Sequence, residues 1–149
     1  MQKKITIIFI FFLLNSCGFS PINTIDKNLK YNLKILNIEG ERELNKYIVN
    51  NIKKYSNTNL NKEIEININT NYSKVSISKD SKGSSTGYKL IATAEFKIKF
   101  NEEIKNISFT EKLILNRLDD VFEEKRYETK MKENLAQLIV KKLIRYLKT

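Results

Sequence analysis

An alternating run at residues 88–100 constrains the fold more than any other stretch of the sequence. Every second side chain is apolar, and most of the side chains between them are charged or polar. The apolar positions are Tyr88, Leu90, Ala92, Ala94, Phe96, Ile98 and Phe100. Because successive side chains of a β-strand point to opposite faces, this period of two predicts a strand with one apolar and one solvated face. The chain therefore contains a sheet whose apolar face must be covered.

Three other stretches predict partner strands. Residues 79–87 (KDSKGSSTG) have the composition of a turn, and before them alternating isoleucines begin a second strand at Ile64, with a bulge expected near residues 72–74. Beyond a tight connection at residues 101–103, alternation over residues 107–115 predicts a further strand, which also carries Glu111. Earlier in the chain, the Leu- and Ile-rich residues 31–39 predict a strand that Gly40 ends.

Two segments have helical periodicity. Residues 41–55 repeat apolar side chains at spacings of three and four, with acids at the start and lysines at the end, as the helix dipole favours. Residues 121–147 form a longer pattern, which Asp120 and Glu123 can cap. Its predicted apolar stripe is Tyr127, Met131, Leu135, Leu138, Ile139, Leu143, Tyr146 and Leu147. This stripe lacks the Trp or Phe typical of membrane-surface helices, so we expect it to pack on the apolar sheet face.

The order strand, helix, strand, strand, strand, helix predicts an α+β fold. A helix between the first two strands makes them parallel, and short turns make the others antiparallel. We expect a two-layer sandwich, in which two helices pack on one face of a four-stranded mixed sheet. Residues 31–149 then form a single domain, with Phe96 of the sheet and Leu135 of the last helix both buried in its core.

The amino terminus has the pattern of an export signal. Lys3 and Lys4 precede ten largely apolar residues, 5–14, which would form a helix of about 15 Å, half the thickness of a hydrocarbon core. The single cysteine, Cys17, follows directly after Leu-Asn-Ser, which resembles a bacterial lipobox. We interpret residues 1–16 as a cleaved lipoprotein signal peptide, Cys17 as the lipidation site and residues 17–30 as a tether. The alternative is an ordinary signal peptide with an incidental cysteine.

The charge balance alone does not establish a partner. The formal net charge is +10, or +8 without Lys3 and Lys4, which suggests an anionic partner such as nucleic acid or a membrane component. However, 23 of the 27 basic residues are lysines, and arginine, which binds phosphate with two parallel hydrogen bonds, is scarce. A basic solvated surface and a specific anion site both remain open.

The composition argues against an enzyme. The chain has no histidine, so histidine-dependent triads and imidazole metal sites are excluded. Its four glycines form no phosphate-binding loop, and its paired acids are adjacent in sequence, so their side chains point apart. We predict no catalytic residues, no metal and no cofactor.

Several short motifs resemble a known family. Residues 17–21 (CGFSP) directly after the lipobox, residues 86–90 (TGYKL) before an alanine-containing strand, and residues 134–136 (NLA) in the last helix are similar to the alphaproteobacterial LptE-type lipoproteins of lipopolysaccharide assembly. The resemblance implies the same sandwich fold. It also implies a lipid-anchored outer-membrane protein facing the periplasm, which partners and plugs an LptD-type barrel translocon and assists lipopolysaccharide transport.

A ligand site is predicted at the hairpin tip. Lys79 and Lys82 lie in the polar turn, where their compact charges can attract the phosphates of lipopolysaccharide. The alternative is that these lysines are solvated and bind no ligand. For the whole protein, the alternatives are a basic envelope lipoprotein that binds nucleic acid and one that stabilises another envelope complex. Under the family resemblance no nucleic acid is expected.

Overall fold

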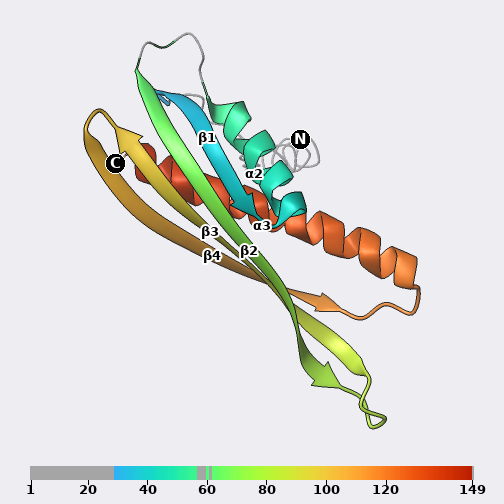
Figure 1. Cartoon of the computed structure of the whole chain (residues 1–149). Coiled ribbons are helices and arrows are strands. Elements are labelled where there is room, and N and C mark those ends of the chain that lie inside the picture. The colour runs from blue at the N-terminus through green and yellow to red at the C-terminus, as the bar shows by residue number, and fades with distance from the viewer. Residues whose placement is uncertain (1–28, 57–59, 61, 149) are drawn as a thin grey trace, which may run out of the picture.

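The computed structural model describes residues 29–56, 60 and 62–148. Its elements are β1 (Asn32–Gly40), α2 (Arg42–Tyr55), β2 (Glu63–Lys79), β3 (Ser85–Phe100), β4 (Glu103–Asn116) and α3 (Val121–Lys148). They form a four-stranded sheet with both helices on one face (Figure 1). The predicted α+β sandwich and its element order are confirmed. Within these described residues, no helix has the length and apolar character needed to cross a membrane.

The sheet is mixed, as the connections require. Its strands lie in the order β1-β2-β3-β4. Strands β1 and β2 are parallel and are connected by α2, whereas β2, β3 and β4 form an antiparallel meander. The β3–β4 turn contains Asn101 at a positive φ of 54°, a conformation that asparagine tolerates better than most residues.

The junction between β1 and α2 is packed closely against β2. Gly40 has a φ of 100°, and a Cβ atom there would lie 1.9 Å from the Thr70 carbonyl oxygen, so no larger residue fits. The next residue, Glu41, donates its backbone N–H to Thr70 Oγ1 at 3.0 Å. The Glu41 carboxylate accepts a hydrogen bond from the Leu44 backbone N–H and caps α2. Gly40 therefore ends the strand as predicted, and Glu41 begins the helix.

The core lies between the sheet and the two helices. Phe96 on β3 is 1% exposed and Leu135 on α3 is fully buried, so the prediction for both residues is confirmed. The same core contains Leu44, Ile48 and Ile52 of α2, together with Leu29, which lies three residues before β1 begins.

Helix α3 is rotated relative to the predicted stripe. Tyr127, Leu138 and Tyr146 were expected to face the sheet, but they are exposed. The buried positions are Glu128, Lys132, Leu135, Ala136, Ile139, Val140, Leu143 and Ile144. The prediction was wrong for these three residues because it assigned the inward face by hydropathy. In the amino-terminal half of α3, charged side chains with partners on β2 and at the start of α2 occupy that face.

The β2–β3 hairpin extends past the helices (Figure 1). Strand β2 makes its last contact with α3 through Lys74. We call the residues beyond this contact, 75–88, the arm. The irregular pairing in β2 lies at residues 76–79 and not near residues 72–74 as predicted. Strand β2 therefore keeps its alternation through Lys74, whose side chain remains on the helix-covered face.

Candidate functional site

The tip of the arm carries both lysines predicted as a ligand site. The turn between β2 and β3 is fixed by Asp80, whose Oδ1 accepts hydrogen bonds from the backbone N–H groups of Lys82 (2.9 Å) and Ser84 (2.8 Å). Gly83 has a φ of 83° in the same turn. Lys79 and Lys82 are exposed on either side of Asp80. The structure therefore presents two ammonium groups at a turn with a defined backbone.

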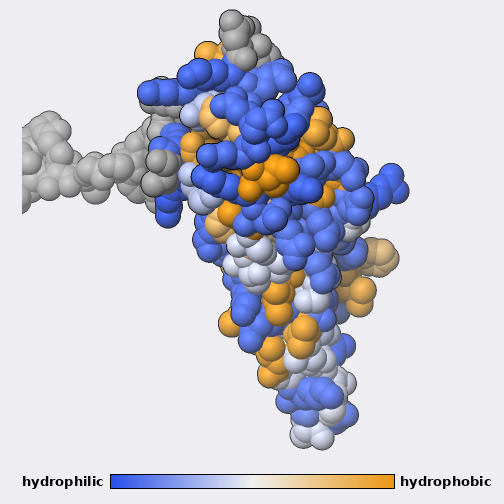
Figure 2. All heavy atoms as spheres, turned by 60° about the vertical axis from the view of Figure 1, so that its left-hand side comes forward, coloured by the Kyte–Doolittle hydropathy of each residue, from blue (hydrophilic) through white to orange (hydrophobic). Residues whose placement is uncertain are grey.

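Apolar side chains are exposed near the arm. Val75, Ile77 and Ile114 are each close to half exposed. At the start of α3, Val121 and Phe122 are 77% and 83% exposed. Figure 2 shows hydrophobic surface continuing along the narrow lower end of the molecule, whereas the tip itself is hydrophilic. This end of the protein thus combines exposed apolar residues with a cationic tip.

A group of ion pairs holds the amino-terminal half of α3 to the sheet. Lys74 of β2 places its Nζ 2.9 Å from Glu124 Oε1 and 3.0 Å from Glu128 Oε2. Tyr72, two residues earlier on the same strand face, donates its hydroxyl to Glu128 Oε1 at 2.9 Å. The Lys74 ammonium also lies 4.2 Å from the centre of the Tyr88 ring on β3. Polar contacts therefore replace apolar packing at this end of the helix.

The same group extends to α2 through Lys132. Its side chain is only 6% exposed, and its Nζ lies 2.6 Å from Glu43 Oε2 and 3.3 Å from Glu41 Oε1. The ammonium also lies 4.3 Å from the centre of the Tyr72 ring, a favourable cation–π position. We call these side chains the ion-pair cluster, which consists of Glu41, Glu43, Tyr72, Lys74, Glu124, Glu128 and Lys132.

The cluster keeps Glu128 and Lys132 charged and Tyr72 protonated. Burial alone would raise the pKa of Glu128, but hydrogen bonds from Lys74 and Tyr72 outweigh it and lower this pKa. Burial would lower the pKa of Lys132, but the hydrogen bond to Glu43 and the charge of Glu41 raise it. The pKa of the Tyr72 hydroxyl is raised, by burial and by its bond to Glu128. Paired charges of this kind fix the position of α3, and we assign them a structural role.

Sequence reasoning missed this cluster, although signals for it were present. Lys74 has the same strand parity as the inward-facing Ile64 and Tyr72, so its side chain belongs to the helix-covered face. Glu128 and Lys132 are four residues apart on one face of α3 and precede Leu135 by about two turns and one turn, respectively. The predicted lipidation site, Cys17, lies outside the described residues.

Comparison with solved structures finds proteins that share this fold. Rare lipoprotein B from Shewanella oneidensis aligns with a TM-score of 0.54 and 13% identity, over 77% of this chain and 95% of that one. A protein described as a lipoprotein from Caulobacter crescentus aligns with a TM-score of 0.54 and 10% identity, over 77% of this chain and 86% of that one. At such identities the likeness shows a shared fold. No protein-family model and no curated protein sequence matches this chain.

Proposed function

We propose that the protein is an LptE-like lipoprotein of the outer membrane, anchored through acyl chains on Cys17 and facing the periplasm. In this role it binds and plugs an LptD-type barrel and assists lipopolysaccharide assembly, without catalysing a reaction. The observation that carries the proposal is the combination of a Leu-Asn-Ser-Cys junction with a fold that also occurs in solved lipoproteins. The arm supports it, because this narrow two-stranded projection extends beyond the two-layer body and can reach into a barrel lumen (Figure 1).

The barrel partnership is tested with the full, acylated chain. An affinity-tagged protein is purified from detergent-solubilised envelopes, and co-purifying proteins are identified by mass spectrometry. Recovery of an LptD-type barrel in stoichiometric amount is the expected result. Recovery of a different envelope complex, or of nucleic acid, would instead support one of the two alternatives considered from the sequence.

Acylation at Cys17 is the first prediction. The thiol of this cysteine is the expected attachment site, because no other cysteine exists in the chain. Metabolic labelling with a fatty acid should therefore mark the wild-type protein and leave Cys17→Ser unlabelled. The wild type should partition with membranes, since two or more acyl chains anchor a protein stably. Persistent labelling of the Cys17→Ser variant would show that the lipobox interpretation is wrong.

The second prediction concerns the cationic tip. Changing Lys79 and Lys82 to glutamate should weaken binding of purified lipopolysaccharide at least about tenfold at low salt, since each lysine near an anionic lipid surface contributes on the order of 1 kcal/mol. The loss should shrink as salt rises, because exposed charges are screened. A fluorescence titration over a series of salt concentrations measures both effects.

The matched control for the tip variant changes two exposed lysines on α2, Lys46 and Lys53, to glutamate. Helix α2 lies far from the arm (Figure 1). The control variant makes the same change in net charge and should bind lipopolysaccharide nearly as the wild type does. Equal losses in both variants would mean that overall charge, and not the tip, governs binding. Unchanged binding in the tip variant would exclude the tip as a ligand site while leaving the barrel proposal standing.

A further inference from the structure

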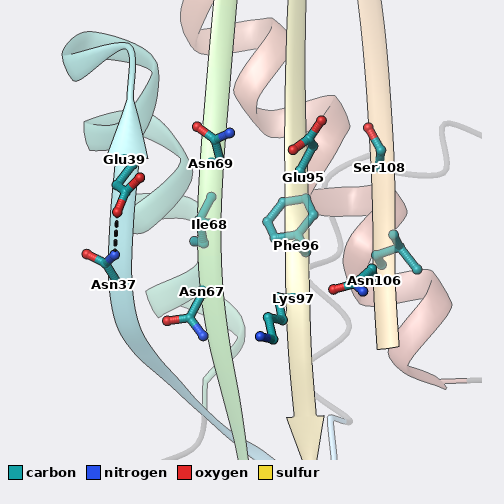
Figure 3. A pocket seen from close by; sticks show the side chains of 11 residues that line it. Asn37, Glu39, Asn67, Ile68, Asn69, Glu95, Phe96, Lys97, Asn106 and Ser108 are labelled. Carbon is teal, nitrogen blue, oxygen red and sulfur yellow. Dashed lines mark hydrogen bonds between the residues drawn. The ribbon is translucent and has the colours of Figure 1, made fainter. Parts of the chain in front are cut away.

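The sheet face opposite the helices contains a polar hollow of about 460 Å³ that spans all four strands. Figure 3 shows its side chains standing in rows across the strands. The polar lining residues are Asn37 and Glu39 of β1, Asn67 and Asn69 of β2, Glu95 and Lys97 of β3, and Asn106 and Ser108 of β4. They lie on the outer face of the sheet, away from the apolar core and from both helices. Neither the tip nor the ion-pair cluster contributes to this hollow.

Strand register places these side chains in two parallel rows. Asn37, Asn67, Lys97 and Asn106 are successive partners across the sheet, and Glu39, Asn69, Glu95 and Ser108 form the next row. The β1 members reach this face because of an irregularity at Leu36, between Ile35 and Asn37. One extra residue reverses the alternation that follows it, so without this bulge Asn37 and Glu39 would point toward the core. The bulge thus completes both rows.

The asparagines in these rows oppose the local preference of the backbone. Asparagine is depleted in strands, where β-branched and aromatic residues are favoured. In the described strands, every asparagine that is not a first or last residue lies on this outer face: Asn37, Asn67, Asn69, Asn71 and Asn106. Four of the five line the hollow and the fifth is in the adjacent row. Departures from local preference that converge on one surface are typical of functional sites.

The side chains of the hollow are available to a ligand. Asn37 donates to Glu39 Oε1 at 2.8 Å (Figure 3). The amides of Asn67, Asn69 and Asn106 have no hydrogen-bond partner among the described residues. Each amide offers two N–H donors and a carbonyl acceptor. The hollow therefore presents unused donors and acceptors on a backbone that the sheet holds rigid.

The chemistry of the hollow selects among ligand classes. Two glutamates and one lysine give it no excess of positive charge, which disfavours phosphate groups and nucleic acid. Its side chains offer no exposed apolar anchor of the kind that protein interfaces use. Hydroxyl and acetamido groups each donate and accept hydrogen bonds; the asparagine amides match them in both roles, and the glutamate carboxylates accept from their donors. Four strands span about 14 Å, the scale of a short oligosaccharide chain.

We propose that this hollow binds a neutral oligosaccharide, held by hydrogen bonds from the asparagine rows. The inference goes beyond the barrel assignment and does not depend on it. It is tested with the full chain in detergent micelles by following side-chain NH₂ signals in nitrogen–proton NMR spectra. N-acetylchitohexaose and maltohexaose are the probes. The expected result is saturable shifts of the Asn67, Asn69 and Asn106 amide signals with at least one of them.

The decisive variant is Asn67→Thr combined with Asn106→Thr. Threonine is the better strand former, so the melting temperature should stay the same or rise. Affinity should fall at least about tenfold, since loss of each neutral hydrogen bond costs roughly threefold to tenfold. Ser73→Thr, on the same face of β2 but outside the hollow, is the matched control and should bind as the wild type does.

Three results would overturn the proposal. One is the absence of shifts with both oligosaccharides. Another is unchanged affinity in the double threonine variant. The third is that a DNA oligonucleotide shifts the same amide signals and binds more strongly than either oligosaccharide, which would identify an anionic ligand. The co-purification experiment tests the barrel proposal independently of these measurements. Either proposal can therefore fail without the other.

Discussion

Leu135→Ala is expected to lower the free energy of unfolding by about 2 to 5 kcal/mol, the range for removing a large aliphatic side chain from a packed core. Leu135 is fully buried where α3 crosses the sheet, and Phe96→Ala should cost a comparable amount because its ring is buried in the same core. Urea unfolding followed by circular dichroism measures both losses.

Leu138→Ala is the matched control for this prediction. The residue has the same size and lies one turn later on α3, but it is 39% exposed. Its replacement should cost less than about 1 kcal/mol, because truncating a side chain that is open to solvent on one side leaves little enclosed cavity. Similar losses at Leu135 and Leu138 would contradict the rotation of α3 described above.

Lys132→Ala is expected to be the most disruptive change of a charged residue. It leaves Glu41 and Glu43 facing the helix interface without their cation, and it removes the ammonium above the Tyr72 ring. Breaking a buried ion pair costs about 3 to 5 kcal/mol, and the lower end applies here because both glutamates are partly exposed. Arg126→Ala removes an exposed pair with Glu123 and should cost less than about 0.5 kcal/mol.

The pH dependence of the stability lost on replacing Lys132 separates the contribution of its charge from that of its packing. The pKa of Lys132 is raised in the folded protein, so its stabilising contribution is complete below the unfolded pKa of about 10.4 and disappears as pH rises through the folded value. The difference between wild type and Lys132→Met, which keeps an unbranched side chain, should therefore be present at pH 7 and decline above about pH 10.4. A difference that stays constant across this range would assign the effect to packing alone.

The sequence predicted the architecture because periodicity reports on burial. Residues 88–100 alternate strictly, and their partner strands are joined by recognisable turns, so the order of elements followed directly. The tip could also be placed, since residues 79–87 have few other conformations open to them between two strands. These features depend on neighbours in the chain, which is the information that a single sequence contains.

The ion-pair cluster and the polar hollow depend on contacts that are distant in sequence. Glu128 and Lys132 look like the solvated side of a helix until Lys74, Glu41 and Glu43 are brought against them. Hydropathy alone therefore placed Tyr127, Leu138 and Tyr146 on the buried face of α3, where the structure has them exposed. The hollow requires the one-residue irregularity at Leu36, and no turn residue in the sequence indicates this irregularity. Register across strands, and not composition, assembles both sites.

The outer strands of the sheet have a consequence for how copies of the protein meet. Strand β4 is an edge of 14 residues, long enough to template another chain. It carries Lys105 and Lys112, and its inward-facing Glu111 forms an ion pair with Lys142 of α3. At the opposite edge of the sheet, the bulge in β1 interrupts the regular spacing of the backbone hydrogen-bonding groups. Charges and bulges at edges oppose strand addition, so crowded copies of this protein should resist aggregation through their sheets.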